Sequence, residues 1–189
     1  MDDLTSKLLV SVPRERSLVD DQDVFDRSVV LVLHHDEEGA HGLILNRPLS
    51  ADVDAVLPGW QEHVSAPDRL FQGGPVSLDT ALGLASMPGD DDETLGVRRI
   101  FGGVCLVDLD APPPVVVPML AALRIYAGYA GWAAGQLEGE IEAGYWFVVD
   151  AEASDPFSDD PADLWQNVLL RQRSALAFAA SFPDDPDQN

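Results

Sequence analysis

The sequence predicts an α+β fold with a mixed sheet, and three observations lead to this class. Short apolar runs bounded by proline and glycine dominate the first half of the chain, helical patterns are interspersed irregularly, and no regular strand-helix alternation appears. The length of 189 residues suits one core, and 46% hydrophobic with 23% charged residues suits a folded chain. We therefore expect a single domain over residues 1–189.

The N-terminal part predicts three strands. Residues 7–12 form a short apolar run that a proline ends. Residues 28–34 are β-branched and continuous rather than alternating, which is typical of a strand covered on both faces. An acidic turn over 36–39 leads to a further strand over 41–46, so these two strands should form an antiparallel hairpin.

The middle of the chain predicts short elements. Ser50 can cap a brief helix over 52–57. The further expected segments are strands over 69–72 and 81–86 around the turn Gly73-Gly74-Pro75, an exposed acidic loop over 88–94, and strands over 96–100 and 104–107.

The C-terminal half predicts helices separated by strands. Prolines 112–114 should open a short helix to about residue 123, followed by an extended segment over 124–127 and a glycine-rich turn over 128–131. A helix over 135–143 should direct Glu138, Glu140 and Glu142 to solvent, and residues 145–149 should form the last strand.

The last predicted helix begins at Asp160, an N-cap acid that precedes proline at the first helical position. Its apolar residues recur at helical spacing and should share one face: Leu164, Trp165, Val168 and Leu169. Pro183 should end the helical region, leaving 183–189 as an acidic tail.

The charge of the chain excludes one class of partner. The 33 acids against 11 bases give a net charge of −22, divided evenly between the two halves of the chain. Binding to a nucleic-acid backbone depends on lysine and arginine replacing condensed counterions, so we expect no direct nucleic-acid partner. The even distribution indicates an acidic, solvated surface rather than an acidic appendage.

Three features of the sequence indicate the compartment and bear on a membrane partner. The N-terminus begins with acids rather than with the bases of a secretory signal. The apolar stretch 115–134 is long enough to cross a bilayer, but Arg124 lies at its centre and proline and glycine interrupt it. The lone Cys105 lies in an apolar run and permits no internal disulfide. We expect a cytoplasmic protein without a membrane partner.

The hairpin holds the first candidate site. His34, His35 and His41 lie around an acidic turn, a composition that can bind a transition metal. Successive strand residues face opposite ways, however, so His34 and His35 cannot both reach one ion. We predict no metal and no cofactor; the open alternatives are a polar hairpin, with His35 hydrogen-bonded to nearby backbone, and a ligand contact.

Two further segments hold candidate residues. The run from Gly128 to Gly135 could present backbone N–H groups to an anion or could pack its backbone tightly against Tyr129 and Trp132. Asn46 and Arg47 end one hairpin strand, and Arg27 precedes the other. If the strands are antiparallel, the two guanidinium groups lie together and can bind a carboxylate of a ligand or of the protein itself.

Several blocks of sequence resemble the bacterial YqgE/AlgH family. They are the segments 7–13, 25–30, 35–49, 73–76 and 128–140, including His41-Gly42-Leu43-Ile44-Leu45-Asn46-Arg47-Pro48 and Gly128-Tyr129-Ala130-Gly131-Trp132. They keep the order found in the family, and the likeness covers about residues 5–170. It implies an α+β fold in which a bifurcated mixed sheet, partly closed into a small barrel, is flanked by helices.

The resemblance implies less about function, because the family is largely uncharacterised. Some members are labelled transcriptional regulators, yet nothing here resembles a DNA-reading helix. This chain also has His34-His35 where the family commonly has Glu-His, which removes an acid from that position.

Two functional hypotheses follow. The sequence has no G-x-S-x-G, Walker A, H-E-x-x-H or paired C-x-x-C motif. This favours a non-enzymatic protein that binds a protein or small-molecule partner, with an indirect regulatory role. The alternative is an enzyme that uses His35 as acid or base, with Asn46 and Arg47 orienting an anionic substrate. Eight candidate site residues follow from both hypotheses: Arg27, His35, Asn46, Arg47, Tyr129, Trp132, Gln136 and Glu138.

Overall fold

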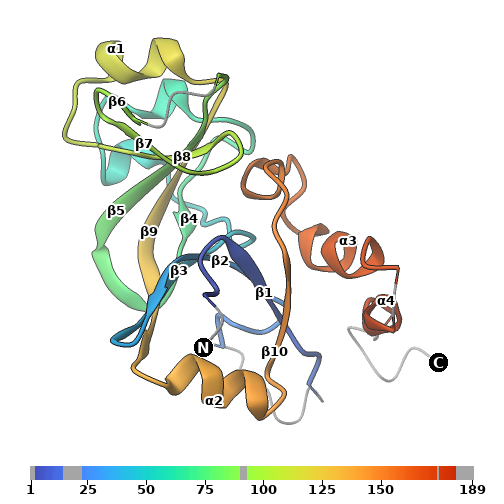
Figure 1. The fold of residues 1–189 in the computed structure, drawn as a ribbon. Coiled ribbons are helices and arrows are strands. Elements are labelled where there is room, and N and C mark those ends of the chain that lie inside the picture. The colour runs from blue at the N-terminus through green and yellow to red at the C-terminus, as the bar shows by residue number, and fades with distance from the viewer. Residues whose placement is uncertain (1–2, 15–22, 90–92, 174, 182–189) are drawn as a thin grey trace.

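The computed structural model describes residues 3–14, 23–89, 93–173 and 175–181. Figure 1 shows a curled sheet with helices at both ends and on one side. The strands are β1 (Lys7–Ser11), β2 (Val29–Asp36), β3 (Gly39–Ile44), β4 (Phe71–Gln72), β5 (Val76–Ser86), β6 (Glu93–Thr94), β7 (Val97–Phe101), β8 (Val104–Val107), β9 (Ala122–Ala133) and β10 (Trp146–Asp150). The helices are α1 (Pro113–Val116), α2 (Gln136–Glu142), α3 (Leu164–Leu170) and α4 (Leu176–Ala179). The predicted α+β class is confirmed.

Strand β9 joins two halves of the sheet. The strand order is β10-β1-β2-β3-β9-β5-β8-β7-β6, with β4 paired to β9 outside this order. Residues 130–133 of β9 pair with β3, whereas residues 122–129 span its pairing with β5. The β4–β9 pair is parallel and the other pairs between described strands are antiparallel. The sheet is therefore mixed and branches at β9, as the family resemblance implied.

The predicted hairpin is present and is buried on both faces. Strand β2 pairs antiparallel with β3 from Val30 opposite Ile44 to Asp36 opposite Gly39. Residues 29–32 are fully buried. On one face they meet α3, and on the other they contribute to the core beneath α2. The continuous β-branched pattern is explained by these two helical covers.

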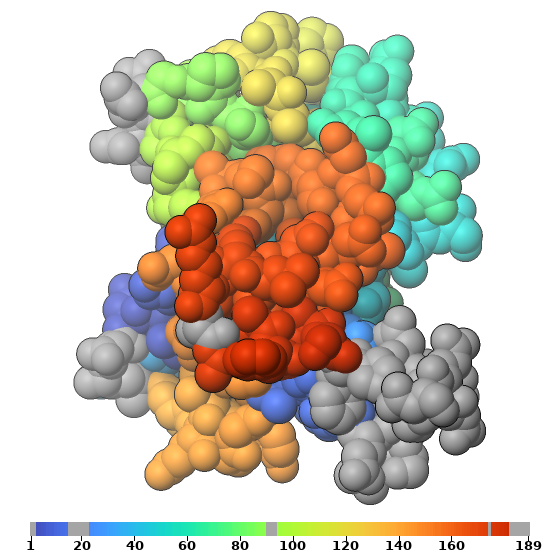
Figure 2. All heavy atoms as spheres, turned by 90° about the vertical axis from the view of Figure 1, so that its right-hand side faces the viewer, coloured from blue at the N-terminus to red at the C-terminus, as the bar shows by residue number. Residues whose placement is uncertain are grey.

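Helix α3 covers one face of strands β1 and β2. Its buried side chains pack with Leu8, Val10 and Leu31, and they are the four predicted from spacing: Leu164, Trp165, Val168 and Leu169. The Trp165 indole N–H donates to the Ser11 carbonyl at 3.0 Å. Figure 2 looks onto this side, where the C-terminal segment, orange to red, spreads across the middle of the molecule.

The other half of the sheet has its own core. Val97, Cys105, Val107 and Ile125 pack with Val116 of α1 and with the connection between β3 and β4. Cys105 is fully buried, as its apolar surroundings predict, and burial raises the pKa of its thiol. This region is the upper part of Figure 1.

The predicted turn over 128–131 is wrong, because β9 runs through it as one strand of twelve residues. Its glycines serve close backbone contact instead. A Cβ on Gly74 would lie 2.1 Å from the carbonyl atoms of Tyr129, and one on Gly73 would lie 2.4 Å from the carbonyl oxygen of Gly128. Gly128 itself has a φ of +69°, which favours glycine. The two glycine blocks therefore pack against one another, backbone to backbone.

Several predicted helix boundaries also need correction. The segment after Pro112 forms α1 and a 3-10 turn over Val117–Met119, and β9 has already begun at Ala122. The brief helix over 52–57 is a 3-10 turn over Val53–Ala55. Helix α3 begins at Leu164 rather than at Pro161, and Asp163 rather than Asp160 is its N-cap residue. The helix predicted after the prolines cannot extend to residue 123, because residues 122 and 123 pair with β5.

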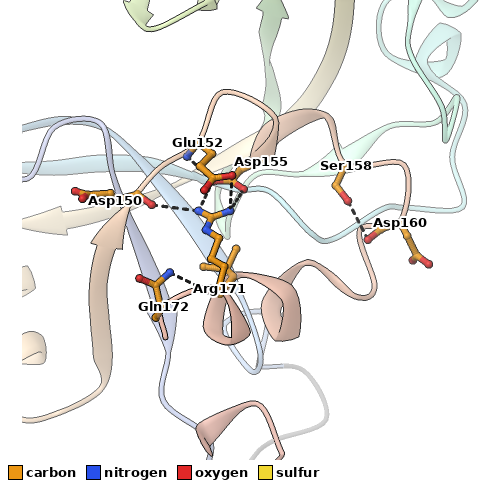
Figure 3. A network of polar contacts seen from close by, with 8 residues as sticks. Asp150, Glu152, Asp155, Ser158, Asp160, Arg171 and Gln172 are labelled. Carbon is orange, nitrogen blue, oxygen red and sulfur yellow. Dashed lines mark hydrogen bonds and ion pairs between the residues drawn. The ribbon is translucent and has the colours of Figure 1, made fainter. Parts of the chain in front are cut away.

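Arg171, which follows α3, forms an ion pair with Asp155 and a hydrogen bond with the last residue of β10 (Figure 3). Arg171 donates to both carboxylate oxygens of Asp155 at 2.5 and 2.8 Å, and to the Asp150 carbonyl at 3.1 Å. Asp155 is buried, and its hydrogen bond to Arg171 raises the pKa of the guanidinium. This forked contact fixes the C-terminal segment onto the sheet.

None of the described helices has the length and apolar character needed to cross a membrane. The apolar stretch considered above is divided between α1, a 3-10 turn and strand β9. The predicted acidic tail lies outside the described residues, as do the three aspartates at 90–92 of the predicted acidic loop.

Candidate functional site

The structure separates the eight candidate residues into two groups and one outlier. His35, Trp132, Gln136 and Glu138 lie together where α2 packs on the sheet, and we call this group, with Glu140 and Trp146, the α2 anchor. Arg27, Asn46 and Arg47 lie together at the opposite end of β2, and we call them the hairpin base. Tyr129 belongs to neither group.

His35 connects three parts of the chain. Its Nε2 lies 2.8 Å from Oε1 of Glu138, and its Nδ1 accepts a hydrogen bond from the Leu4 backbone N–H at 3.2 Å. Because Nδ1 is the acceptor, the neutral ring carries its proton on Nε2 and donates it to Glu138. The side chain is only 2% exposed. His35 therefore fastens the N-terminal segment and α2 to strand β2.

This geometry differs from the one that the enzyme hypothesis requires. A general acid or base must reach a substrate, yet both ring nitrogens of His35 are occupied within the chain and its surface is closed. Asn46 bonds to Val29, at the start of β2, whereas His35 lies near the other end of the same strand. Six residues of extended strand separate the two positions by about 20 Å. One small substrate cannot contact both.

Glu140 holds two buried tryptophans. Its Oε2 accepts the indole N–H of Trp132 at 2.9 Å and that of Trp146 at 2.8 Å. The two indoles meet edge to face with centroids 6.1 Å apart, and Phe25 packs against both. Each tryptophan residue is 6% exposed. One carboxylate thus satisfies the only polar atom of two large apolar side chains.

Gln136 completes the start of α2. Its Oε1 accepts the Ala133 N–H at 3.0 Å, and its Nε2 donates to Glu140 at 3.1 Å. The expectation that all three glutamates of this helix face solvent is therefore wrong for two of them. Glu138 and Glu140 are half-buried against the sheet, and Glu142 alone of the three is exposed.

The hairpin base is held by main-chain contacts. The Asn46 carbonyl oxygen accepts the Val29 N–H at 3.0 Å, and its amide donates to the Arg27 carbonyl at 2.9 Å. Asn46 is 5% exposed. The Asn46 side chain thus supplies hydrogen bonds to the backbone where the pairing of β2 with β3 ends.

The two arginines lie at this same end, as the antiparallel hairpin requires. Arg47 donates to the backbone carbonyl of Asp26, and burial lowers the pKa of its guanidinium. Arg27 lies over the Trp165 ring at 4.7 Å from its centroid and has a φ of +47°. The sequence predicted that Arg47 binds a carboxylate, either of a ligand or of the protein itself. The structure shows it bound to a main-chain carbonyl instead.

Tyr129 lies on the other face of the sheet from Trp132 and meets His41 with ring centroids 5.4 Å apart. His34 is exposed and contacts Asp36 at 2.8 Å, whereas His35 is buried. The prediction that the two adjacent histidines face opposite ways is confirmed. The described residues contain no group of three or more histidine, cysteine, aspartate or glutamate side chains placed to hold a metal ion.

A surface hollow lies elsewhere, on strands β7 and β8. It has a volume of about 390 Å³ and is lined by Thr94, Gly96, Val97, Arg98, Leu106, Val107 and Asp108. None of the eight candidate residues lines it.

The Glu138 carboxyl gives the α2 anchor a pH dependence. A backbone N–H bond and then the His35 hydrogen bond lower the pKa of Glu138 below its usual 4.5. A lowered folded-state pKa means that the carboxylate stabilises the fold above pH 4.5 and that this contribution is lost as the pH falls through the folded-state value. The melting temperature should therefore fall more steeply between pH 5 and 3 in the wild-type chain than in Glu138→Gln.

The direct check is an NMR titration of the Glu138 side chain. Its midpoint should lie below 4.5 and should rise toward that value in His35→Ala, with part of the shift retained because the backbone bond remains. A wild-type midpoint at or above 4.5 would contradict the bonding described here.

Sequence reasoning missed the residues that organise the anchor. Glu140, Trp146 and Phe25 were not candidates, although the spacing of Gln136 and Glu140 places them one helical turn apart. That spacing was the available signal. The contact between Trp146 and Trp132 could not be predicted from the sequence, since it joins strands β9 and β10, which are separated by α2 along the chain.

The fold and its contacts define a class of protein: a small α+β domain whose curled, branched sheet forms a half-barrel flanked by short helices. A family model described as AlgH-like matches residues 11–177. The chain belongs to this family, as the sequence blocks indicated.

Named relatives agree with this assignment. A UPF0301 protein of Streptomyces avermitilis is 51% identical over 189 residues, covering 98% of this chain and 95% of the relative, and one of Streptomyces coelicolor is 50% identical with the same coverage. A crystal structure of a Corynebacterium diphtheriae protein superimposes with a TM-score of 0.84 at 32% identity, covering 94% of this chain and 92% of the other. The solution structure of AlgH from Pseudomonas aeruginosa, at 22% identity, gives a TM-score of 0.68 with 97% and 96% coverage and shares the fold.

Proposed function

We propose that this protein acts by binding a partner and not by catalysis. One observation carries the proposal. The side chains of His35, Asn46 and Arg47 all form hydrogen bonds with other groups of the chain itself. Such groups position segments of the fold and present its surface, but they do not converge on a reacting atom. His35, Asn46 and Arg47 accordingly hold in place the segments that form the surface of the protein.

A regulatory role for such a protein would be indirect. The net charge of −22 opposes contact with a nucleic-acid backbone. We therefore propose that any effect on gene expression passes through another protein. A cytoplasmic location fits the single cysteine, which is buried and cannot form an internal disulfide.

The test asks whether the protein consumes a substrate. The purified chain and its His35→Gln variant are incubated with a small-molecule extract of the organism that encodes them, and the extract is followed by mass spectrometry. Gln can both donate and accept hydrogen bonds at this position. We expect no compound to be consumed by either protein. A compound consumed by the wild-type chain and spared by His35→Gln would overturn the proposal and restore the enzyme hypothesis.

Binding of a small molecule has separate support in the hollow on β7 and β8. Its volume of about 390 Å³ falls within the range of ligand pockets, and its lining combines Val97 and Leu106 with the opposite charges of Arg98 and Asp108. A screen of small zwitterionic and carboxylate compounds should shift the backbone amide resonances of Val97 and Val107. Shifts that persist in a Leu106→Trp variant, which fills the hollow, would place the ligand elsewhere.

A further inference from the structure

Strand β10 ends the sheet with an open edge. In an antiparallel pair, alternate residues direct their N–H and C=O groups toward the neighbouring strand. The Val12 N–H donates to the Tyr145 carbonyl at 3.0 Å, so Tyr145, Phe147 and Val149 direct their backbone groups toward β1. Trp146, Val148 and Asp150 must therefore direct theirs away from the sheet.

These outward groups are available. Among the described residues, the N–H and C=O groups of Trp146 and Val148 and the N–H of Asp150 have no hydrogen-bond partner, while the Asp150 carbonyl accepts from Arg171. The strand lies at the outside of the sheet beside β1 in Figure 1. Its neighbours on the two faces, α2 and α3, cover side chains and leave this row of backbone groups unpaired.

The side chains of β10 suit a strand partner. Phe147 and Val148 are half-buried on opposite faces of the sheet, so each offers apolar surface next to the open edge. Such an edge with β-branched and aromatic residues is the kind that accepts an added strand.

Charge decides which strand this edge accepts. Asp150 and Glu152, at the C-terminal end of β10, have side chains that are 86% and 63% exposed, and Glu142 is exposed at its N-terminal end. Lys7 pairs with Asp150, and Arg171 pairs with Asp155 and Glu152, so the acids at this edge outnumber the bases and leave it with a net negative charge. The whole chain carries −22, so a second copy would meet like charges along the edge.

We propose that the open edge of β10 binds an extended, basic segment of a partner protein by strand addition. Backbone groups of Trp146, Val148 and Asp150 supply the hydrogen bonds, and the acids at the two ends select for lysine and arginine. This inference rests on the proposed binding function and specifies its partner class.

The probe is a blocked peptide of about eight residues that alternates valine and lysine, long enough to span one strand. Binding should slow amide hydrogen exchange at Trp146, Val148 and Asp150, whereas the amides of Phe147 and Val149 are already paired within the sheet. A matched peptide of valine and glutamate should bind at least about tenfold more weakly, and salt raised from about 50 to 300 mM should weaken the basic peptide.

A backbone variant gives the decisive control. Val148→Pro removes an N–H that points away from the sheet, so the pairing of β1 with β10 is preserved, because proline is tolerated on edge strands. This variant should lose at least about tenfold in affinity for the basic peptide, whereas Val148→Thr, which keeps the N–H and the branched side chain, should retain it.

Three results would overturn the inference: equal binding by Val148→Pro, equal binding of the acidic peptide, or protection that appears away from β10. If Val148→Pro fails to fold, the exchange pattern of the wild-type chain still decides. If the peptide does not bind at β10, the proposed binding function still stands, since a partner could bind another surface. Substrate turnover by His35 would overturn both the strand-addition proposal and the proposed function.

Discussion

Replacing Arg124 with methionine should destabilise the protein by about 3–5 kcal/mol. The substitution removes a buried cation and leaves the carbonyl groups that accept its hydrogen bonds without a donor. Arg124 is 1% exposed and donates to the carbonyls of Pro156 at 2.8 Å, Ala66 at 2.7 Å and Ser158 at 3.0 Å. It also lies over the Phe71 ring at 4.3 Å from its centroid. One guanidinium thus connects β9, the loop before β4 and the segment before α3.

The guanidinium is held without a carboxylate partner within ion-pair distance among the described residues, and burial lowers its pKa. Tyr126 shares the Pro156 carbonyl at 3.3 Å, and burial raises the pKa of its phenol, which keeps it a neutral donor. The Nε atom of Arg124 has no hydrogen-bond partner among the residues that the structure describes. Hydrogen bonds from the guanidinium to three main-chain carbonyls, and not a salt bridge, therefore hold Arg124 in place.

Thermal and urea unfolding measure the effect. The melting temperature of Arg124→Met should fall by roughly 10 °C or more, since 1 kcal/mol corresponds to a few degrees in a chain of this size. Arg124→Lys should give an intermediate loss, because one ammonium cannot serve three carbonyls in a plane. Exposed Arg98→Met is the matched control and should stay within about 0.5 kcal/mol of the wild type. A loss below about 1 kcal/mol in Arg124→Met would contradict this account.

Replacing Glu140 with alanine should cost about 2–4 kcal/mol, because two buried indole N–H groups would lose their acceptor. Those groups belong to Trp132 and Trp146, each bonded to the same carboxylate oxygen. Loss of this contact should loosen α2 first. The readouts are a red shift of tryptophan fluorescence and faster amide exchange in α2, together with the free energy of unfolding.

Two variants separate the role of hydrogen bonding from that of helix composition. Glu142→Ala changes an exposed glutamate in the same helix and should stay within about 0.5 kcal/mol of the wild type. Glu140→Gln keeps one acceptor oxygen and should fall between the alanine variant and the wild type. Equal stability of Glu140→Ala and Glu142→Ala would show that the carboxylate contributes nothing to the anchor.

These expectations change how the first candidate residues should be tested. On sequence grounds, substitution of Arg47 or Trp132 should impair binding with little change in melting temperature. Trp132 is buried and Arg47 is half-buried, and both are hydrogen-bonded within the chain, so their loss should lower stability. The surface that remains for a partner is better tested at β10, where Val148→Pro spares the internal contacts.

Local patterns were sufficient for much of the fold. The hairpin of β2 and β3, the opposite orientation of His34 and His35, the apolar face of α3 and the burial of Cys105 all follow from alternation, helical spacing or turn chemistry. Each of these features depends on residues close together in sequence. The family resemblance supplied the branching of the sheet, which no local pattern contains.

Contacts between distant segments decided the rest. Gly128 became part of a continuous strand because Gly74 packs against the backbone beside it, and Glu140 turned inward because two tryptophans from different strands meet there. The sequence by itself determined an acidic α+β domain without a recognisable catalytic motif and identified polar residues of special position. Only the tertiary structure decided that those residues hold the chain together and that β10 carries unpaired backbone groups, because hydrogen bonds between remote segments leave no periodic pattern in the sequence.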